Sequence, residues 1–203
     1  MRVIGTVGLP GSGKGEFAAV AREAGVPVVT MGDVVREACR ERGLDPAEHH
    51  GEVARALREE DGPLAIARRS VPHVRAALEE SGTVVVDGLR SGREASFFAE
   101  EFGDAWTLVA VEAPFETRAE RIETRGRDDT ATETLRERDA RERGFGMDEA
   151  IEVADVTIEN DGTLAAFREA ARAVLSPETP VEAADDGEPD RNPDHPRSGG
   201  EGA

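Results

Sequence analysis

The stretch that decides the fold reads GLPGSGKGE and runs from residue 8 to residue 16. It follows the short apolar run Val3–Gly8 and precedes an amphipathic stretch, so it predicts a turn between a strand and a helix. Glycines let the backbone N–H groups of such a turn point inward, and the helix start adds the positive end of its dipole. The spacing G-x-x-x-x-G-K therefore predicts a loop that binds the phosphates of ATP. The residues expected to contact them are Gly8, Leu9, Pro10, Gly11, Ser12, Gly13, Lys14, Gly15 and Glu16.

Two features indicate how Mg²⁺ would be held at this loop. The residue after Lys14 is Gly15, so the Ser or Thr hydroxyl that commonly binds the ion is missing. The run Thr83–Asp87 places a carboxylate directly after four β-forming residues. Carboxyl ends of parallel strands share one edge of a sheet, so we expect Asp87 to lie beside the loop and to bind Mg²⁺ together with phosphates and waters. The alternative is an acid that merely ends a strand at a turn.

Outward from the loop, five apolar runs alternate with longer amphipathic stretches. Each run is rich in Val and Ile and is bounded by Gly, Pro or a charged residue, which is typical of strands. The runs are Val3–Gly8, Pro27–Thr30, Thr83–Asp87, Thr107–Glu112 and Asp155–Glu159. Strands separated by helices predict an α/β fold, with a doubly wound, five-stranded parallel sheet flanked by helices.

The same pattern gives the expected domain boundaries. One P-loop domain is expected over residues 1–176. Between the second and third runs, residues 32–81 carry helical periodicity without a strand, which predicts a helical insertion. Residues 177–203 are rich in Pro, Asp and Glu and hold no aromatic residue, which is typical of a disordered acidic tail.

Composition limits the classes of partner. The net charge is −18 at pH 7, so nucleic acids and anionic membranes would repel the chain. Of the 25 cationic residues, Lys14 is the single lysine and all others are arginines. Abundant acids with almost no lysine indicate a protein adapted to a salty, potassium-rich cytoplasm, where salt screens self-repulsion. A GC-rich genome that favours Arg codons is the alternative.

The sequence also bears on location and assembly. Cys39 is the single cysteine, so no internal disulfide is expected. No stretch approaches the roughly 18 consecutive apolar residues that a membrane-spanning helix needs. We expect a soluble cytoplasmic protein, either a monomer or a homodimer.

Several strings resemble those of adenylate kinase and its nucleoside monophosphate kinase relatives. The matching strings are GLPGSGKG at 8–15, TMGDVVR at 30–36, DGLR at 87–90, RDD at 127–129 and NDG at 160–162. The chain is similar, more closely, to an archaeal family of kinase-like P-loop proteins related to adenylate kinase and dephospho-CoA kinase. That family carries the strings MGDVVR, DGxRS and RDxRE, all of which are present here. The habitat suggested by composition and this resemblance together favour a haloarchaeal source.

The resemblance implies roles for individual residues. Lys14, Arg121, Arg125 and Arg138 would stabilise the moving phosphoryl group, and Asp87 would organise Mg²⁺. The helical insertion at about 32–81 would bind the acceptor through Asp33 and Arg36, together with Arg90 from the DGLR string. A short lid at about 126–144 would carry Arg127, Arg138 and Arg141.

The residues themselves agree with this interpretation. Phosphoryl transfer spreads charge over three oxygens, and planar guanidinium groups are suited to stabilising it. Eight arginines lie between residues 118 and 143, although pairing with the many acids on solvated helix faces is the alternative for any one of them. They are Arg118, Arg121, Arg125, Arg127, Arg136, Arg138, Arg141 and Arg143.

The acceptor is the open part of the prediction. The leading hypothesis is an ATP-dependent, Mg²⁺-assisted phosphotransferase that acts on a small nucleotide-like molecule. A monophosphate acceptor attacks through an ionised oxygen and needs no general base, whereas a hydroxyl acceptor, as in dephospho-CoA kinase, needs a carboxylate. Asp33 is the candidate base, or else the N-cap of a helix that follows Gly32. A slow ATPase that acts as a nucleotide-dependent switch, and a structural protein that binds no ATP, are the remaining hypotheses.

Overall fold

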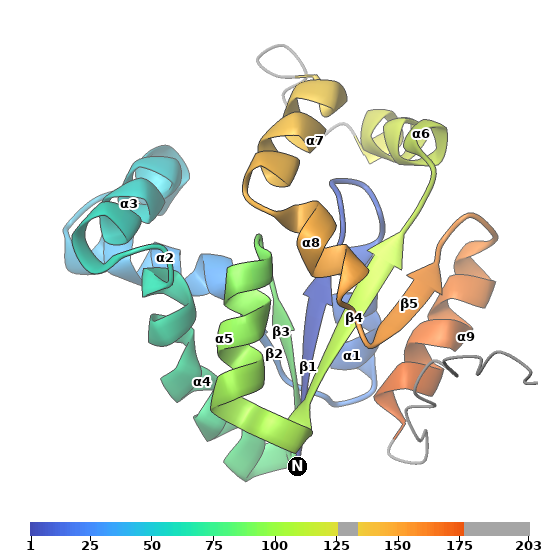
Figure 1. The fold of residues 1–203 in the computed structure, drawn as a ribbon, viewed down its shortest axis with the longest axis horizontal. Helices are drawn as coiled ribbons and strands as arrows, with labels where there is room; N and C mark the ends of the chain where they lie inside the picture. Colours follow the sequence, from blue (N-terminus) through green and yellow to red (C-terminus); the bar gives the residue numbers. More distant parts are fainter. Residues whose placement is uncertain (126–133, 177–203) are drawn as a thin grey trace, which may run out of the picture.

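The fold is built on one sheet of five parallel strands. The computed structural model describes residues 1–125 and 134–176. In it the strands β1 (Arg2–Val7), β2 (Val28–Thr30), β3 (Thr83–Asp87), β4 (Trp106–Glu112) and β5 (Val156–Glu159) lie in the order β2-β3-β1-β4-β5. Every neighbouring pair is parallel. The α/β class and the five strands predicted from the apolar runs are confirmed, and no strand end differs from its prediction by more than one residue (Figure 1).

The strands read as continuous apolar runs because both faces of the sheet are covered. Val84, Val85 and Val86 are successive residues of β3, and all three are fully buried. Alternate side chains of a strand point to opposite faces, so Val85 packs in one hydrophobic core while Val84 and Val86 pack in the other. The sheet is therefore the middle of three layers.

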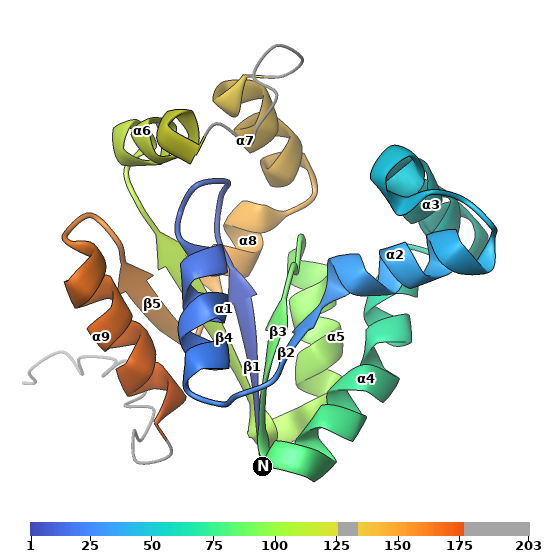
Figure 2. The ribbon, with the colours of Figure 1, turned by 180° about the vertical axis from the view of Figure 1, so that it is seen from behind.

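Helices cover the two faces unequally. On one face, α1 and α9 pack around Ile4 and Phe167; on the other, α4, α5 and α8 form the larger core (Figures 1 and 2). The described helices are α1 (Lys14–Glu23), α2 (Met31–Glu41), α3 (Pro46–Asp61), α4 (Ala65–Ser81), α5 (Gly92–Phe102), α6 (Phe115–Arg125), α7 (Leu135–Gly144), α8 (Met147–Glu152) and α9 (Leu164–Leu175), with a single 3-10 turn at Gly103–Ala105.

Three helices connect β2 to β3, where the sequence predicts an insertion. The first two, α2 and α3, pack on each other beyond the end of the sheet, and α4 returns along its face (Figure 2). Local sequence sets these boundaries: the Asp45 carboxylate caps α3 by accepting from Ala47 N at 2.8 Å, and Pro46 is its first residue. The insertion therefore projects over the carboxyl edge of the sheet.

Two helices, α6 and α7, lie beyond the same edge (Figure 1). The connection between them, residues 126–133, lies outside the described residues, as does the predicted tail, residues 177–203. None of the helices in the described ranges combines the length and apolar composition that a bilayer crossing requires.

Candidate active site

The predicted phosphate loop joins the carboxyl end of β1 to the first turn of α1, at the middle of the sheet. Gly8, Gly11 and Gly13 have φ of 145°, 80° and 124°, a backbone region that other residues rarely adopt. A Cβ on Gly13 would lie 2.3 Å from Asn160 Nδ2, and one on Gly8 would lie 2.3 Å from Val111 O. The glycines are thus required by both backbone conformation and close packing. The loop leads directly into α1, whose N-cap is Gly13, and the start of a helix provides backbone N–H groups and a positive dipole end that favour an anion.

Lys14 is half-buried within this loop. Its ammonium donates to the carbonyls of Gly8 and Leu9, the second at 3.3 Å. Burial lowers the pKa of Lys14, while the carboxylates of Asp87 and Glu142 raise it and the guanidinium groups of Arg90 and Arg118 lower it. A negative ligand would compensate the burial of this cation, so the loop favours phosphate electrostatically.

The outer side of the loop is held by the segment after β5. Asn160 Nδ2 donates to Ser12 O at 2.7 Å, and Arg121 donates to Asn160 O at 2.9 Å and to Asn160 Oδ1 at 3.1 Å. The hydroxyl of Ser12 is buried, and it has no hydrogen-bond partner among the residues that the structure describes. Buried polar groups are normally satisfied, so this hydroxyl fits a partner supplied by a bound ligand.

Asp87 ends β3 beside the loop, where the strand pattern placed it. Its Oδ1 accepts a hydrogen bond from Thr6 Oγ1 on the neighbouring β1 at 3.0 Å. Within residues 1–125 and 134–176, no three His, Cys, Asp or Glu residues gather into a metal site. One carboxylate with phosphates and waters is nevertheless a common way to hold Mg²⁺. The residues present therefore fit Mg²⁺ carried in by a nucleotide.

A cavity of about 560 Å³ opens between the insertion and the loop after β3. Four arginines line it: Arg55 and Arg58 from α3, Arg90 from the loop after β3, and Arg141 from α7. Glu59 is the one acidic residue among the described residues that line it. In a chain with net charge −18, such a cavity is suited to an anionic small molecule. Arg55 and Arg58 were not predicted as site residues; they are one helical turn apart, but nothing in their local sequence marks them.

Neighbouring titratable groups respond to this environment. His50 also lines the cavity, and its pKa is lowered chiefly by burial, with Arg36, Arg90 and Arg58 adding to the effect. Behind Arg90, Glu94 is buried and accepts from the Arg90 backbone N–H at 2.7 Å; burial raises the pKa of Glu94. The cavity wall is thus positive, with a neutral imidazole beside it at pH 7.

Asp33 and Arg36, predicted to bind the acceptor, face each other instead. Arg36 donates to Asp33 Oδ1 from Nε at 2.9 Å and from Nη2 at 2.5 Å, and both side chains are exposed. Neither residue is among those lining the arginine cavity. The alternative that Asp33 caps a helix is wrong: α2 begins at Met31 with Thr30 as its N-cap, so Asp33 lies inside the first turn. The helix begins directly after Thr30, the last residue of β2, so Gly32 lies inside its first turn.

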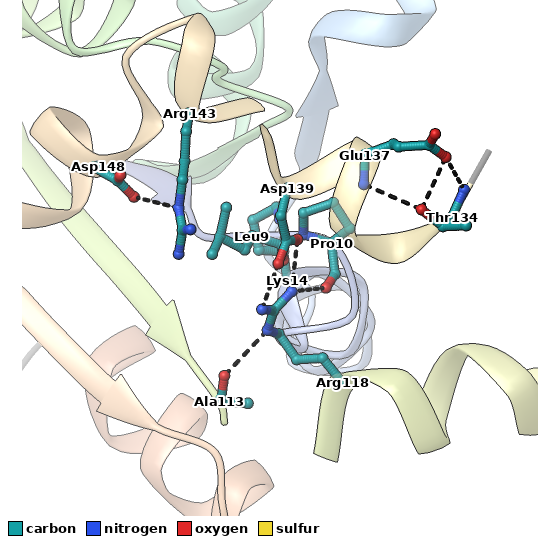
Figure 3. A network of polar contacts seen from close by, with 10 residues as sticks. All are labelled: Leu9, Pro10, Lys14, Ala113, Arg118, Thr134, Glu137, Asp139, Arg143 and Asp148. Carbon is teal, nitrogen blue, oxygen red and sulfur yellow. Dashed lines mark hydrogen bonds and ion pairs between the residues drawn. The ribbon is translucent and has the colours of Figure 1, made fainter. Parts of the chain in front are cut away.

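The predicted lid helix, α7, is tied to the phosphate loop through a buried ion pair (Figure 3). Arg118 on α6 donates to both carboxylate oxygens of Asp139 on α7, at 2.8 and 2.7 Å. The same guanidinium donates to Pro10 O at 3.0 Å and to Ala113 O at 3.2 Å. Sequence reasoning counted Arg118 among the arginines but assigned no role to it or to Asp139. The two residues are 21 positions apart in the sequence, so their contact depends on how α6 and α7 pack.

A second ion pair ties α7 to the acceptor side. Arg90 Nη1 donates to Glu142 Oε1 at 2.8 Å, and Arg141 Nη2 lies 3.6 Å from the same oxygen. The Glu142 carboxylate is buried. Of the other predicted cations, Arg138 lies on α7 and Arg125 is the last residue of α6. The side chain of Arg125 and the whole of Arg127 lie outside the described part of the chain.

Comparison with known proteins agrees with this architecture. The AAA domain family matches residues 7–136. A UPF0200 protein of Halobacterium salinarum is 58% identical over 181 residues, covering 89% of this chain and 95% of its own. A UPF0200 protein of Methanothrix thermoacetophila is 48% identical, covering 86% and 97%. The archaeal relatedness predicted from the sequence strings is confirmed.

Solved structures resemble the fold at low sequence identity. The crystal structure of TT1252 from Thermus thermophilus aligns with a TM-score of 0.60 and 23% identity, covering 88% of this chain and 98% of that one. Shikimate kinase from Acinetobacter baumannii, in complex with shikimate, aligns with a TM-score of 0.52 and 18% identity, covering 86% and 91%. The fold is that of the P-loop kinases.

Proposed function

The chain belongs to the UPF0200 family and to the AAA domain family that matches residues 7–136, and from this membership and the geometry of the site we propose that it is an ATP-dependent phosphotransferase acting on a nucleotide or a related small molecule. The observation that carries the proposal is the meeting of two sites at one edge of the sheet. A phosphate loop lies on one side of Arg90, and an arginine-lined cavity lies on the other. A phosphotransferase needs this arrangement because donor and acceptor must meet.

The donor half of the proposal rests on the loop. The backbone N–H groups at the start of α1 would bind the phosphates, the Ser12 hydroxyl would gain its missing partner, and Lys14 would neutralise the transferred group. Arg121 would contribute from the side of Asn160. Mg²⁺ would enter with ATP, held by Asp87, and would supply charge neutralisation of the phosphates when bound.

The acceptor half rests on the cavity. Guanidinium groups bind phosphate and carboxylate through paired hydrogen bonds, and four of them face one space. The chain as a whole is strongly negative, so four arginines around one space favour an anionic ligand. Arginines on a solvated helix face would instead pair with nearby acidic side chains. Asp33 and Arg36 remain predicted acceptor residues that would have to break their mutual ion pair to reach it.

An acceptor screen tests the proposal. ADP release from ATP would be measured in concentrated KCl, with AMP, CMP, dephospho-CoA and shikimate offered separately. We expect one class of compound to raise ADP release well above hydrolysis. Arg58→Ala should then raise the KM for that acceptor by about tenfold or more, because an anion contact is lost, and leave the KM for ATP unchanged.

Arg22→Ala is the matched control, since Arg22 is an exposed arginine at the opposite end of α1. Lys14→Ala should weaken ATP binding strongly. ATP hydrolysis that no compound stimulates would contradict the phosphotransferase and favour the nucleotide-dependent switch. For that alternative, the buried contact from the Pro10 carbonyl through Arg118 to α7 is the connection by which nucleotide would act on the lid.

A further inference from the structure

Glu142 lies between the donor and acceptor sites and was not predicted as a functional residue. It lies on α7 and is 7% exposed. Its carboxylate accepts a hydrogen bond from Arg90, which lines the proposed acceptor cavity. On the donor side, Glu142 is near enough to Lys14 for its charge to raise the pKa of that lysine. The carboxylate is thus in electrostatic contact with the cation that would bind the transferred phosphoryl group and with the one that would bind the acceptor.

The other carboxylate near Lys14 is already occupied. Asp87 accepts from Thr6 and is the residue placed to hold Mg²⁺. The predicted base, Asp33, is exposed and bonded to Arg36, whereas Glu142 is buried and bonded to Arg90, which lines the cavity. Neither carboxylate is itself among the residues that line the cavity. Among the residues that the structure describes, both recorded contacts of the Glu142 carboxylate use Oε1, so Oε2 is available to accept a proton.

This placement discriminates between the two kinds of acceptor. A phosphate acceptor would bring its attacking oxygen, already negative, against a buried carboxylate and would have to take Arg90 from it. A hydroxyl acceptor carries a proton that the same carboxylate can take. From this geometry we propose that the acceptor attacks through a hydroxyl group and that Glu142 is the general base that receives its proton.

The rest of the cavity defines the class of acceptor. With Arg90 engaged by Glu142, Arg55 and Arg58 still line the space, and the His50 imidazole lies beside them. These groups would bind a carboxylate or phosphate elsewhere on the acceptor. The substrate class is therefore a small hydroxyl compound that carries a separate anionic group.

The reaction balances without a further reactant. The hydroxyl oxygen attacks the γ-phosphorus of ATP, and the bond from that phosphorus to the β,γ-bridging oxygen breaks, so its electron pair leaves with ADP. The hydroxyl proton passes to Glu142 Oε2 and then to solvent. The products are a phosphomonoester, ADP and one proton. This inference rests on the proposed phosphotransferase function.

The experiment identifies the acceptor atom to which the phosphorus of ATP is transferred. The full chain, in concentrated KCl with ATP and Mg²⁺, would be given AMP, CMP, dephospho-CoA or shikimate, and products would be assigned by ³¹P NMR. We expect phosphomonoesters on hydroxyl oxygens and no new P–O–P linkage. Water is itself a hydroxyl acceptor, so slow ATP hydrolysis provides a second measurement that needs no identified substrate.

Variants separate the base from a merely structural carboxylate. Glu142→Gln should lower kcat, for both the acceptor and hydrolysis, by about 100-fold, with the KM for ATP changed less than about twofold. Glu142→Asp should retain an intermediate rate. Glu152→Gln removes the same charge from an exposed site on α8 and should behave like wild type. Circular dichroism and ATP affinity would show that each variant is folded.

The outcomes distinguish this inference from the function on which it rests. Conversion of monophosphates to diphosphates would uphold the phosphotransferase and overturn the hydroxyl acceptor. An unchanged or faster rate in Glu142→Gln would also overturn it. If no compound is phosphorylated, the phosphotransferase itself fails, and Glu142 is judged by hydrolysis: a fall of about 100-fold supports the base, and an unchanged rate excludes it.

Discussion

At the residue scale, Lys14 shows how one side chain can be specified by charge. Every other cation of the chain is an arginine, which keeps its proton at any ordinary pH. A compact ammonium fits between the carbonyls of Gly8 and Leu9, where a planar guanidinium would not bond in the same way. The consequence of using lysine in a buried place is a lowered pKa.

That lowered pKa predicts the pH dependence of ATP binding. Phosphates bind the protonated ammonium, and Lys14 loses its proton at a pH below the ordinary lysine value of 10.5. Affinity for ATP should therefore be full at neutral pH and fall as pH rises through the lowered pKa. Titration calorimetry in buffers of different ionisation enthalpy would also detect proton uptake on binding in that range.

Lys14→Met is the control for this prediction. It should bind ATP weakly and show no alkaline loss of affinity, since it has no proton to lose. A wild-type affinity that stays constant up to pH 10.5 would contradict the prediction.

At the element scale, α7 is held by its acidic side chains. Asp139 bonds to Arg118, and Glu142 bonds to Arg90, so the lid helix is connected to the phosphate loop and to the acceptor cavity by separate ion pairs. A third contact joins α7 to α6: the Arg136 guanidinium lies 4.4 Å from the centre of the Phe115 ring. The helix thus contacts Arg90, which lines the cavity, and Arg118, which bonds to the phosphate loop.

The Arg118–Asp139 pair should be important for stability. The two residues are 3% and 5% exposed, so Asp139→Ala leaves a buried guanidinium without its counter-charge. We expect a loss of about 3–5 kcal/mol in the free energy of unfolding, measured by urea titration. The double variant Arg118→Met with Asp139→Leu should recover much of this loss, because no buried charge then remains.

An exposed pair provides the comparison. Arg75 and Glu101 join α4 to α5 at the surface, and Glu101→Ala should cost about 1 kcal/mol or less. Equal losses for Asp139→Ala and Glu101→Ala would show that burial of the first pair has no energetic consequence.

At the scale of the whole molecule, net charge governs the conditions under which the fold is stable. The chain has 43 acidic residues and only 25 cationic ones, so its negative charges repel one another, while four arginines line the cavity. Composition alone predicts a salty cytoplasm for this chain.

Salt should therefore stabilise the protein. As the Debye length shortens between about 0.1 M and 1 M KCl, repulsion between surface carboxylates is screened. We expect the midpoint of thermal unfolding to rise by about 10 °C, which corresponds to roughly 3 kcal/mol in a domain of this size. Sucrose at matched osmolality is the control for non-ionic exclusion. A midpoint that falls with KCl would contradict a halophilic adaptation.

The sequence by itself determined the sheet and the loop that we propose as the donor site. The apolar runs gave all five strands, and Gly8, Gly11, Gly13, Lys14 and Asp87 lie where their patterns placed them. These features depend on local interactions: backbone conformation in the loop, burial of both faces of each strand, and the shared carboxyl edge of parallel strands.

Only the tertiary structure decided the arginine-lined cavity that we propose as the acceptor site. Arg55 and Arg58 on α3, Arg90 after β3, and Arg141 with Glu142 on α7 come together because three distant segments meet over one edge of the sheet. Asp33 and Arg36, which the motif favoured, pair with each other outside it. Such meetings depend on how helices pack after the chain has folded, and a pairwise contact over 52 residues, as between Arg90 and Glu142, leaves no periodic trace in the sequence.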